Sequence, residues 1–416
     1  MISVGGGVPG DVTMATTRPI DWSERFRQMF RRYDEALLRQ VAAKLFKPRN
    51  QWPLEDLIDR SVATLSNVAV IDRRLEALPL SARLLLSLIG HSRQPRWRTG
   101  SLIELLVMLG EEPTLQPIVD LMEAGLVCPE LPEASRLQSF EQWISQGFAL
   151  GARLFAHPSV TARLLGQELP LPCCPGVISA AHPAREADGL EWFLRLSVAR
   201  QRVAAGPMRR TQGGEYFKRD LDRLRSDPLL NAPPADNLRD IPDAGLLAIE
   251  LSVLEGLVRQ ESGELRAGTP PENWGQGTAS GLASLWTALL EVGDWNIDEG
   301  WQANRLPSNP YPSFYLASLL LLSRLAPGAW AEAAAVETCV RDHHPYWQSQ
   351  RSPRATARRA KTEEPQESPG SFLLGLAYQL RLVETAGGSN DSGLVRLSVG
   401  IEDPADLIAD FDRALA

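Results

Sequence analysis

The residues whose chemistry is easiest to read in this sequence are its cations. The chain has 416 residues, 43 of them lysine or arginine, and a formal net charge of −8 at pH 7. This balance excludes a protein-wide attraction to nucleic acid or to an anionic membrane, so any such contact must be local. In residues 207–225 the basic residues Arg209, Arg210, Lys218, Arg219, Arg223 and Arg225 outnumber the acidic residues Glu215, Asp220 and Asp222. This stretch favours either phosphate contacts or a solvated helix face with internal salt bridges.

The sequence gives little support for metal binding or nucleotide hydrolysis. None of the four cysteines stands in a CxxC or Cys/His spacing that could close a zinc site, so reduced structural thiols are expected. The adjacent His343 and His344 diverge in direction and are interpreted as surface or helix-end residues. The phosphate-binding pattern GxxxxGK[ST] does not occur, which excludes a nucleotide-driven motor. The sequence therefore predicts no catalytic residue, no metal site and no cofactor.

The elements that must position the cations are mostly helical. After residues 1–20, which are expected to be disordered, a helical segment is predicted over 21–77, and its apolar spacing indicates one helix through residues 22–41. Residues 81–131 then contain three short helical patterns followed by a strand, and Gly90, Gly110 and Gly125 stand where glycine ends a helix. This is the plan of a winged helix, predicted over residues 78–167.

Two more units repeat that order after a proline-rich linker at 168–186. The second covers 187–270 and ends in a hairpin with Ser262 and Gly263 at its turn. The third covers 271–400 and holds an apolar-poor stretch, 348–370, expected to be a mobile loop. A docking helix is predicted at 401–416. The expected fold is therefore mainly α with small β-hairpins, built from tandem winged-helix units joined by helical segments.

The stretches LPLSARLLLSLIG with PIVDLMEAGLV, MRRTQGGEYFKRDLDRLRSDPLLNAPP, and FLLGLAYQLRLVE with LVRLS resemble a family of bacterial helicase-associated proteins. That family is similar to the N-terminal region of XPB-type repair helicases, in which winged-helix units are strung together. The resemblance covers most of the chain and implies a non-enzymatic adaptor or regulatory role beside a helicase motor, with a helicase, nucleic acid or both as partners.

The last stretch, GLVRLSVGIEDPADLIADFDRALA, resembles instead the C-terminal end of pyridoxal-phosphate enzymes of cysteine and methionine metabolism. In that family the arginine matching Arg396 holds the substrate carboxylate, a task that suits a guanidinium. Such an enzyme needs a lysine for the Schiff base in an S-x-T-K-Y-x-x-G-H context. The four lysines here, Lys44, Lys47, Lys218 and Lys361, stand in other contexts. A diverged or truncated enzyme is therefore the alternative to the adaptor.

The third helix of a winged helix usually enters the DNA major groove. In the first unit its exposed positions would be Thr114, Gln116, Asp120 and Glu123, and the two carboxylates would repel phosphates. The better candidates for nucleic-acid contact lie in the second unit; they are Arg209, Arg210, Lys218, Arg219 and Arg223. Residues 1–19 lack signal-peptide features, and the longest apolar run, 314–323, is about half of the ~20 residues that span a bilayer, so a cytoplasmic location without membrane contact is expected.

Overall fold

The fold is mainly helical, with small antiparallel sheets. The computed structural model describes residues 22–49, 51–92, 94, 96–131, 135–145, 150–179, 183–206, 208–211, 215–234, 236–261, 263–271, 274–275, 277–302, 309–350, 369–386 and 393–398. About 52% of the structure is helical, which confirms the expected class of mainly α with small β elements. The predicted disordered N-terminus at 1–20 and the docking helix at 401–416 lie outside the described residues, as does most of the loop at 348–370.

The N-terminal segment is helical but is not led by one continuous helix through residue 41. The chain turns at Tyr33, and the Asp34 side chain accepts the N–H of Ala36, which starts a new helix. This cap was missed because the apolar spacing continues across it. The segment contains α1 (Trp22–Phe30), α2 (Glu35–Leu45), α3 (Leu54–Thr64) and α4 (Val68–Glu76).

Unit 1, residues 78–167, has a strand between its first two helices that the sequence does not predict. Arg96–Arg98 forms β1, a strand too short to leave a period in the sequence. The three strands are antiparallel in the order β1-β3-β2. The unit contains α5 (Leu80–Ser92), β1, α6 (Thr99–Met108), α7 (Gln116–Glu123), β2 (Val127–Pro129), α8 (Phe140–Ser145), β3 (Arg153–Ala156), α9 (Pro158–Thr161) and a short 3-10 turn (Ala162–Leu164).

Unit 2, residues 187–270, has a similar succession of helix, strand, helix, helix, strand, strand, without the helix that unit 1 inserts between its last two strands. Its antiparallel sheet again places the last strand between the other two, in the order β6-β8-β7. The predicted hairpin is confirmed, with Gly263 at φ 79° in its turn. The elements are α10 (Glu191–Ala205), β6 (Met208–Arg209), α11 (Lys218–Arg225), α12 (Ala244–Leu254), β7 (Val258–Glu261) and β8 (Glu264–Ala267).

Unit 3, residues 271–400, shows a related succession with one further helix before its last two strands. It follows a helix and a hairpin, α13 (Thr278–Leu289), β9 (Trp295–Asn296) and β10 (Gly300–Trp301). A short strand, Trp330–Glu332, precedes the helix Ala333–His343. The elements are α14 (Tyr311–Leu322), β11 (Trp330–Glu332), α15 (Ala333–His343), α16 (Pro345–Gln350), a π-helical turn (Phe372–Ala377), β12 (Val383–Ala386) and β13 (Leu394–Leu397).

The proline-rich segment 168–186 does more than join two units. It contributes β4 (Val177–Ile178) and β5 (Ala184–Arg185), which pair with the two outer strands of the unit 3 sheet. That sheet therefore has five strands in the order β4-β11-β13-β12-β5. Residues 168–186, which connect units 1 and 2 in the sequence, therefore form both edges of the unit 3 sheet.

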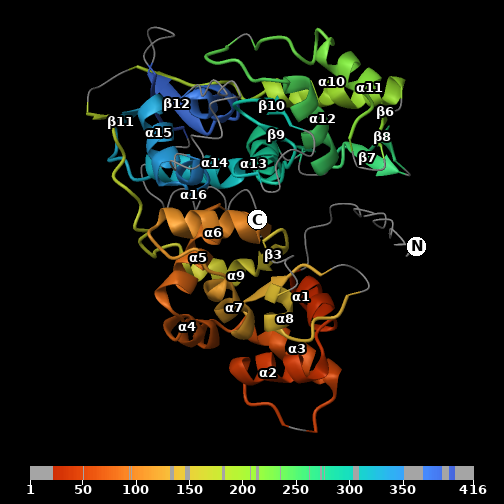
Figure 1. Cartoon of the computed structure of the whole chain (residues 1–416), viewed down its shortest axis with the longest axis vertical. Helices are drawn as coiled ribbons and strands as arrows, with labels where there is room; N and C mark the ends of the chain where they lie inside the picture. Colours follow the sequence, from red (N-terminus) through yellow and green to blue (C-terminus); the bar gives the residue numbers. More distant parts are fainter. Residues whose placement is uncertain are drawn as a thin grey trace.

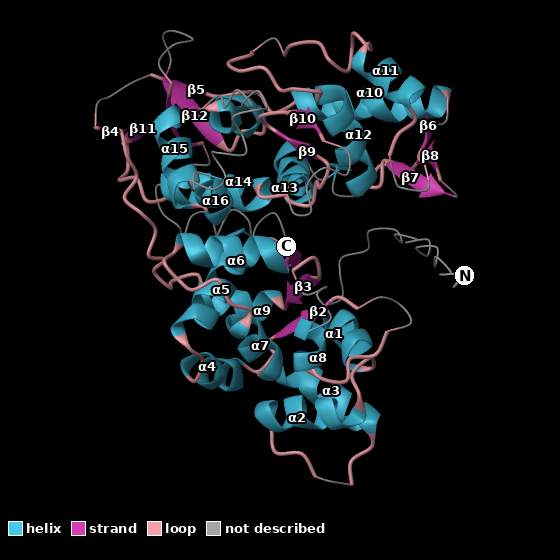
Figure 2. Ribbon diagram, viewed as in Figure 1, coloured by secondary structure: helices cyan, strands magenta, loops and turns pink. Residues whose placement is uncertain are grey.

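Units 2 and 3 lie beside each other in the upper part of the molecule, and unit 1 with the N-terminal helices forms the lower part (Figure 1; Figure 2). Helix α6 of unit 1 packs against α14, α15 and α16 of unit 3 and forms the joint between the two parts. One large apolar core runs through the described residues of all three units, and Trp330, Ala386 and Leu394 form a small separate cluster in unit 3.

Candidate functional site

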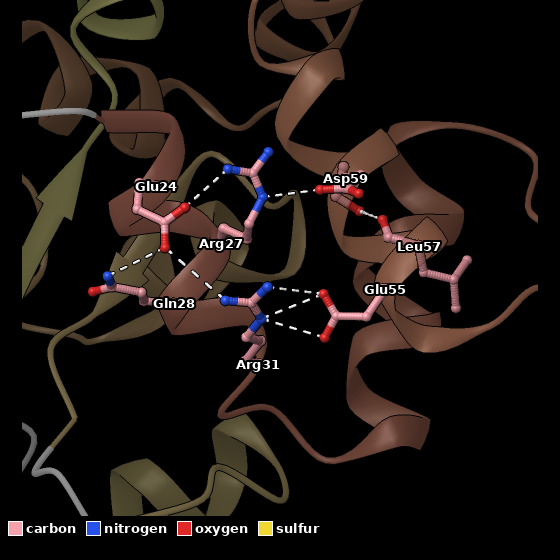
Figure 3. A network of polar contacts seen from close by, with 8 residues as sticks. Glu24, Arg27, Gln28, Arg31, Glu55, Leu57 and Asp59 are labelled. Atoms are coloured by element: carbon pink, nitrogen blue, oxygen red, sulfur yellow. Dashed lines mark hydrogen bonds and ion pairs between the residues drawn. The ribbon is translucent and has the colours of Figure 1, made fainter.

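The arginines of α1 are bound by carboxylates of the protein. Arg27 contacts Asp59 at 2.9 Å and Glu24 at 3.0 Å, and these hydrogen bonds raise its pKa. Arg31 contacts Glu55 of α3 at 3.0 Å (Figure 3). The positive face of α1 therefore ties two helices together and offers little charge to a phosphate.

The candidates in residues 207–225 separate into two groups. Arg209 lies on β6 with two thirds of its side chain exposed, and its guanidinium contacts Glu264 at 3.1 Å. Arg223 is 47% exposed and lies 3.6 Å from Asp220. Lys218 and Arg219 are exposed in the first turn of α11, and within the described ranges neither has an ion pair. These four side chains are brought together at one end of unit 2.

Arg210 is directed into the protein. Its guanidinium forms a close ion pair with Glu250 of α12 and donates to the Tyr216 hydroxyl at 2.6 Å, and that hydroxyl in turn donates to Glu250 at 2.6 Å. The guanidinium also lies 4.5 Å from the centre of the Tyr216 ring. Burial alone would lower the pKa of Arg210, but the Glu250 carboxylate and Tyr216 outweigh it and the pKa is raised. Arg210 thus holds β6 to α12 and is poorly placed to reach a phosphate.

The sequence did not single out three further exposed residues of unit 2 that lie on the same side as Arg209 and Lys218. Arg259 and Arg266 stand directly opposite each other on β7 and β8, and both are exposed. Phe217, just before α11, is 48% exposed. The sequence held two signals: the arginines flank the predicted hairpin turn symmetrically, and Phe217 adjoins Lys218 in the run YFKR.

The third helix of each unit is packed against protein. In unit 1, α7 buries Pro117, Ile118, Val119, Leu121 and Met122, and α2 lies over its end. In unit 2, α12 is buried on nearly all sides by α10, α11 and α13. In unit 3 the whole turn Phe372–Ala377 is buried. Helix α12 and the turn Phe372–Ala377 are therefore unavailable to read bases. Helix α7 keeps Gln116 exposed and Asp120 and Glu123 partly exposed, and these two carboxylates would repel phosphates.

A serine, a histidine and a carboxylate do meet at the joint between units 1 and 3. The hydroxyl of Ser313 lies 2.6 Å from Glu104 Oε2 and 3.0 Å from His344 Nε2. The His344 Nδ1, however, accepts the N–H of Tyr346, so the ring proton resides on Nε2 and this nitrogen cannot act as a base toward Ser313. Ser313 and His344 are also fully buried. The cluster is a packing contact between units and offers no nucleophile to a substrate.

Burial sets the protonation of this cluster. It raises the pKa of Glu104 to about 7, with the Ser313 hydrogen bond opposing the shift, and it lowers the pKa of His344 to about 3. Near pH 7 the imidazole is therefore neutral, and the 3.7 Å approach of His344 to Glu104 is not an ion pair.

Arg396, the carboxylate ligand in the pyridoxal-phosphate alternative, is occupied. It contacts Glu384, its cross-strand partner on β12, at 2.8 Å, and its guanidinium lies 4.6 Å from the centre of the Trp330 ring. Of the four lysines, Lys44, Lys47 and Lys218 are exposed on the surface and Lys361 lies outside the described residues. The described residues therefore bring no lysine to Arg396 that could form a Schiff base there.

A polar cavity of about 470 Å³ lies between units 2 and 3. Its lining includes Asn237, Arg239, Asp240, Asp298 and Ser371. The Asp298 carboxylate is held by Arg341 at 2.9 Å and by the Tyr311 hydroxyl at 2.8 Å, so it is already neutralised. Across the described ranges, no three His, Cys, Asp or Glu side chains converge as metal ligands, and no helix has the length and apolar character needed to cross a membrane.

No family model, no curated protein and no solved structure matches this chain. The resemblances to helicase-associated proteins and to the pyridoxal-phosphate enzymes therefore stay hypotheses, carried by the residues that suggested them.

Proposed function

We propose that this protein is a non-enzymatic adaptor built from three winged-helix units, which binds nucleic acid through the exposed cations of unit 2. The observation that carries the proposal is the threefold repeat of one topology. Unit 2 has the order helix, strand, helix, helix, strand, strand. Unit 1 inserts α8 between its last two strands and unit 3 has one further helix before them, and in every unit the last strand pairs between the other two. A winged helix has this arrangement of three helices and a hairpin.

The burial of the third helices determines how such an adaptor works. Because α12 and the turn Phe372–Ala377 are buried and the open face of α7 carries carboxylates, none of the three offers a cationic surface to the major groove. Contact with nucleic acid then falls to the phosphate backbone, which arginine and lysine side chains bind without regard to base sequence. Arg209, Lys218, Arg219 and Arg223 supply that contact, and Arg210 supports them from inside.

The protein partner implied by the family resemblance is a helicase motor of the XPB type, beside which this chain would act as a regulatory subunit. A cytoplasmic, reducing location belongs to the same proposal, and the free thiols of Cys128, Cys173, Cys174 and Cys339 support it. Coexpression with an XPB-type helicase followed by size-exclusion chromatography tests the partner.

Fluorescence anisotropy of the purified protein with labelled duplex and single-stranded DNA, at several salt concentrations, tests the nucleic-acid role. The affinity should fall with salt at a slope of about −0.9 per phosphate contact on duplex. The double variant Lys218→Ala/Arg219→Ala should weaken binding about tenfold and reduce that slope by about 2.

The matched control is Lys44→Ala/Lys47→Ala, which removes the same charge from exposed positions in and just after α2, at the opposite end of the molecule (Figure 1). Equal losses in the two double variants would show that only net charge matters and would reject the unit 2 surface. Absence of binding at low salt would reject the nucleic-acid role and leave the protein-binding role.

A further inference from the structure

The end of unit 2 carries an exposed aromatic ring beside its unpaired cations. The N–H of Phe217 donates to the carbonyl of Arg209 at 3.4 Å, and the N–H of Arg209 donates to Asp220 at 3.2 Å. These bonds fix the start of α11 against β6, an outer strand of the unit 2 sheet. Phe217 and Lys218 therefore lie next to Arg209. Phe217 has no ring contact with another aromatic or cationic side chain in the part of the chain that is described.

The outward face of the sheet extends this surface. Arg209 stands opposite Glu264 on β8, and Arg266 lies two residues farther along β8 on the same face, opposite Arg259 of β7. Like charges placed directly across two strands repel each other. Arg266 has two loose carboxylate contacts, at 3.5 and 3.9 Å, whereas Arg259 has none among the described residues. Glu261 and Glu264 share this face, so its arginines Arg209, Arg259 and Arg266 leave a net of one positive charge.

We propose that this surface binds an unpaired stretch of nucleic-acid strand, with a base stacked on Phe217 and the phosphates held by Arg259 and Arg266. The inference rests on the proposed function and narrows it to a class of substrate. The positive charge of the surface favours a polyanionic ligand. The exposed Phe217 ring favours a single strand over a duplex, because the faces of the bases in a duplex are covered by neighbouring bases. Surfaces that bind single strands without sequence preference combine cations along the backbone with aromatic side chains under the bases in this way.

The test compares Phe217→Leu with the wild-type protein in anisotropy titrations against an oligothymidylate of about 20 nucleotides and a blunt duplex. Leucine keeps an apolar side chain and removes the ring face, and Phe217 is exposed enough for the variant to fold, which circular dichroism verifies. Single-strand affinity should fall about 5- to 100-fold, while duplex affinity and the salt slope stay unchanged. Phe217→Tyr, which retains a ring, should restore single-strand binding.

Arg259→Ala/Arg266→Ala should lower the salt slope on the oligothymidylate by about 1.4. If the wild-type protein binds the oligothymidylate but Phe217→Leu binds it equally well, the stacking inference is overturned and the proposed nucleic-acid role stands. If the wild-type protein binds neither ligand at low salt, both fail together. A loss of duplex affinity as large as that for the single strand would also overturn the preference for an unpaired strand.

Discussion

Helices α1 and α11 are both short and rich in arginine, and both mix their cations with carboxylates, yet the fold uses them in opposite ways. Arg27 on α1 and Arg31 just after it reach Asp59 and Glu55 of α3, so their charge joins two helices. On α11, Lys218 and Arg219 meet no carboxylate within the described ranges and face solvent. The difference does not lie in the local sequence, because the carboxylates that decide it come from another helix. A basic stretch is available to a ligand only where tertiary packing leaves it unpaired.

The largest expected effect concerns a carboxyl group that, unlike Glu55, is buried without a cation. Glu104 has a pKa raised to about 7 by burial, against 4.5 in the unfolded chain, and it faces a neutral His344. The folded state thus holds a proton that the unfolded state has released, and the contribution of Glu104 to the free energy of unfolding should fall as pH rises from about 4.5 to about 7. Glu337, fully buried and with a pKa also raised to about 7, adds to this fall. His344, whose pKa is lowered from 6.5 to about 3, contributes with the opposite sign between about pH 4.5 and about pH 7, so the Glu104 contribution is measured as a difference between variants.

Urea denaturation of the wild-type protein and Glu104→Gln at pH 5 and pH 8 measures the contribution of Glu104. The variant should reduce the loss of unfolding free energy between the two pH values by on the order of 3 kcal/mol, since each pKa unit corresponds to about 1.4 kcal/mol. Glu55→Gln is the control, because its side chain is 61% exposed. If the unfolding free energy of Glu104→Gln changed between pH 5 and pH 8 by the same amount as that of the wild type, Glu104 would not be a carboxyl group buried without a cation between units 1 and 3.

The second prediction distinguishes Arg210 from its exposed neighbour Arg209. Arg210→Ala leaves Glu250 buried without its cation and should lower the free energy of unfolding by about 2 kcal/mol. Arg209→Ala should lower it by less than about 0.5 kcal/mol, because that side chain is 67% exposed. Chemical denaturation of both variants compares them directly. Equal losses would mean that Arg210 is not the structural member of the pair.

The smallest changes in the free energy of unfolding should come from substitutions on α11 and on or just after α1. Arg27→Ala/Arg31→Ala removes four partly exposed ion pairs and should cost about 1 kcal/mol. Lys218→Ala/Arg219→Ala should cost nothing and could add up to about 0.5 kcal/mol, because cations in the first turn oppose the helix dipole. Thermal melts at low salt resolve the opposite signs. A comparable loss in both variants would show that the α11 cations also have partners.

Sequence reasoning succeeded where the signal is local. Gly110 and Gly125 end their helices at φ 89° and 73° as predicted, and the hairpin of unit 2 lies where alternation and Gly263 placed it. Gly90 was interpreted wrongly as a helix end: it lies inside α5, where a Cβ atom would approach the Thr161 carbonyl to 3.0 Å. Glycine there permits a close packing of two segments, which no local pattern reveals.

The rest depended on contacts between distant residues. The strands Arg96–Arg98 and Trp330–Glu332 are too short for alternation to be visible and are defined by their pairing. The inward position of Arg210 depends on Glu250, and the availability of Arg259 depends on the register of its hairpin. The sequence therefore indicated a basic region in unit 2 but could not sort its members into structural and exposed residues.

The two short strands at the borders of the unit 3 sheet, β4 and β5, affect the order in which the chain can fold as it is synthesised. Strands β4 and β5 leave the ribosome before unit 2, whereas β11 and β12, with which they pair, are made only after it. Pairings between such distant segments form slowly, and open strand edges invite wrong partners in the meantime. Unit 2 can therefore fold on the nascent chain while β4 and β5 are still without their partner strands. A translational pause ahead of Val383 would leave the unit 3 sheet incomplete, with strand edges exposed to association with other chains.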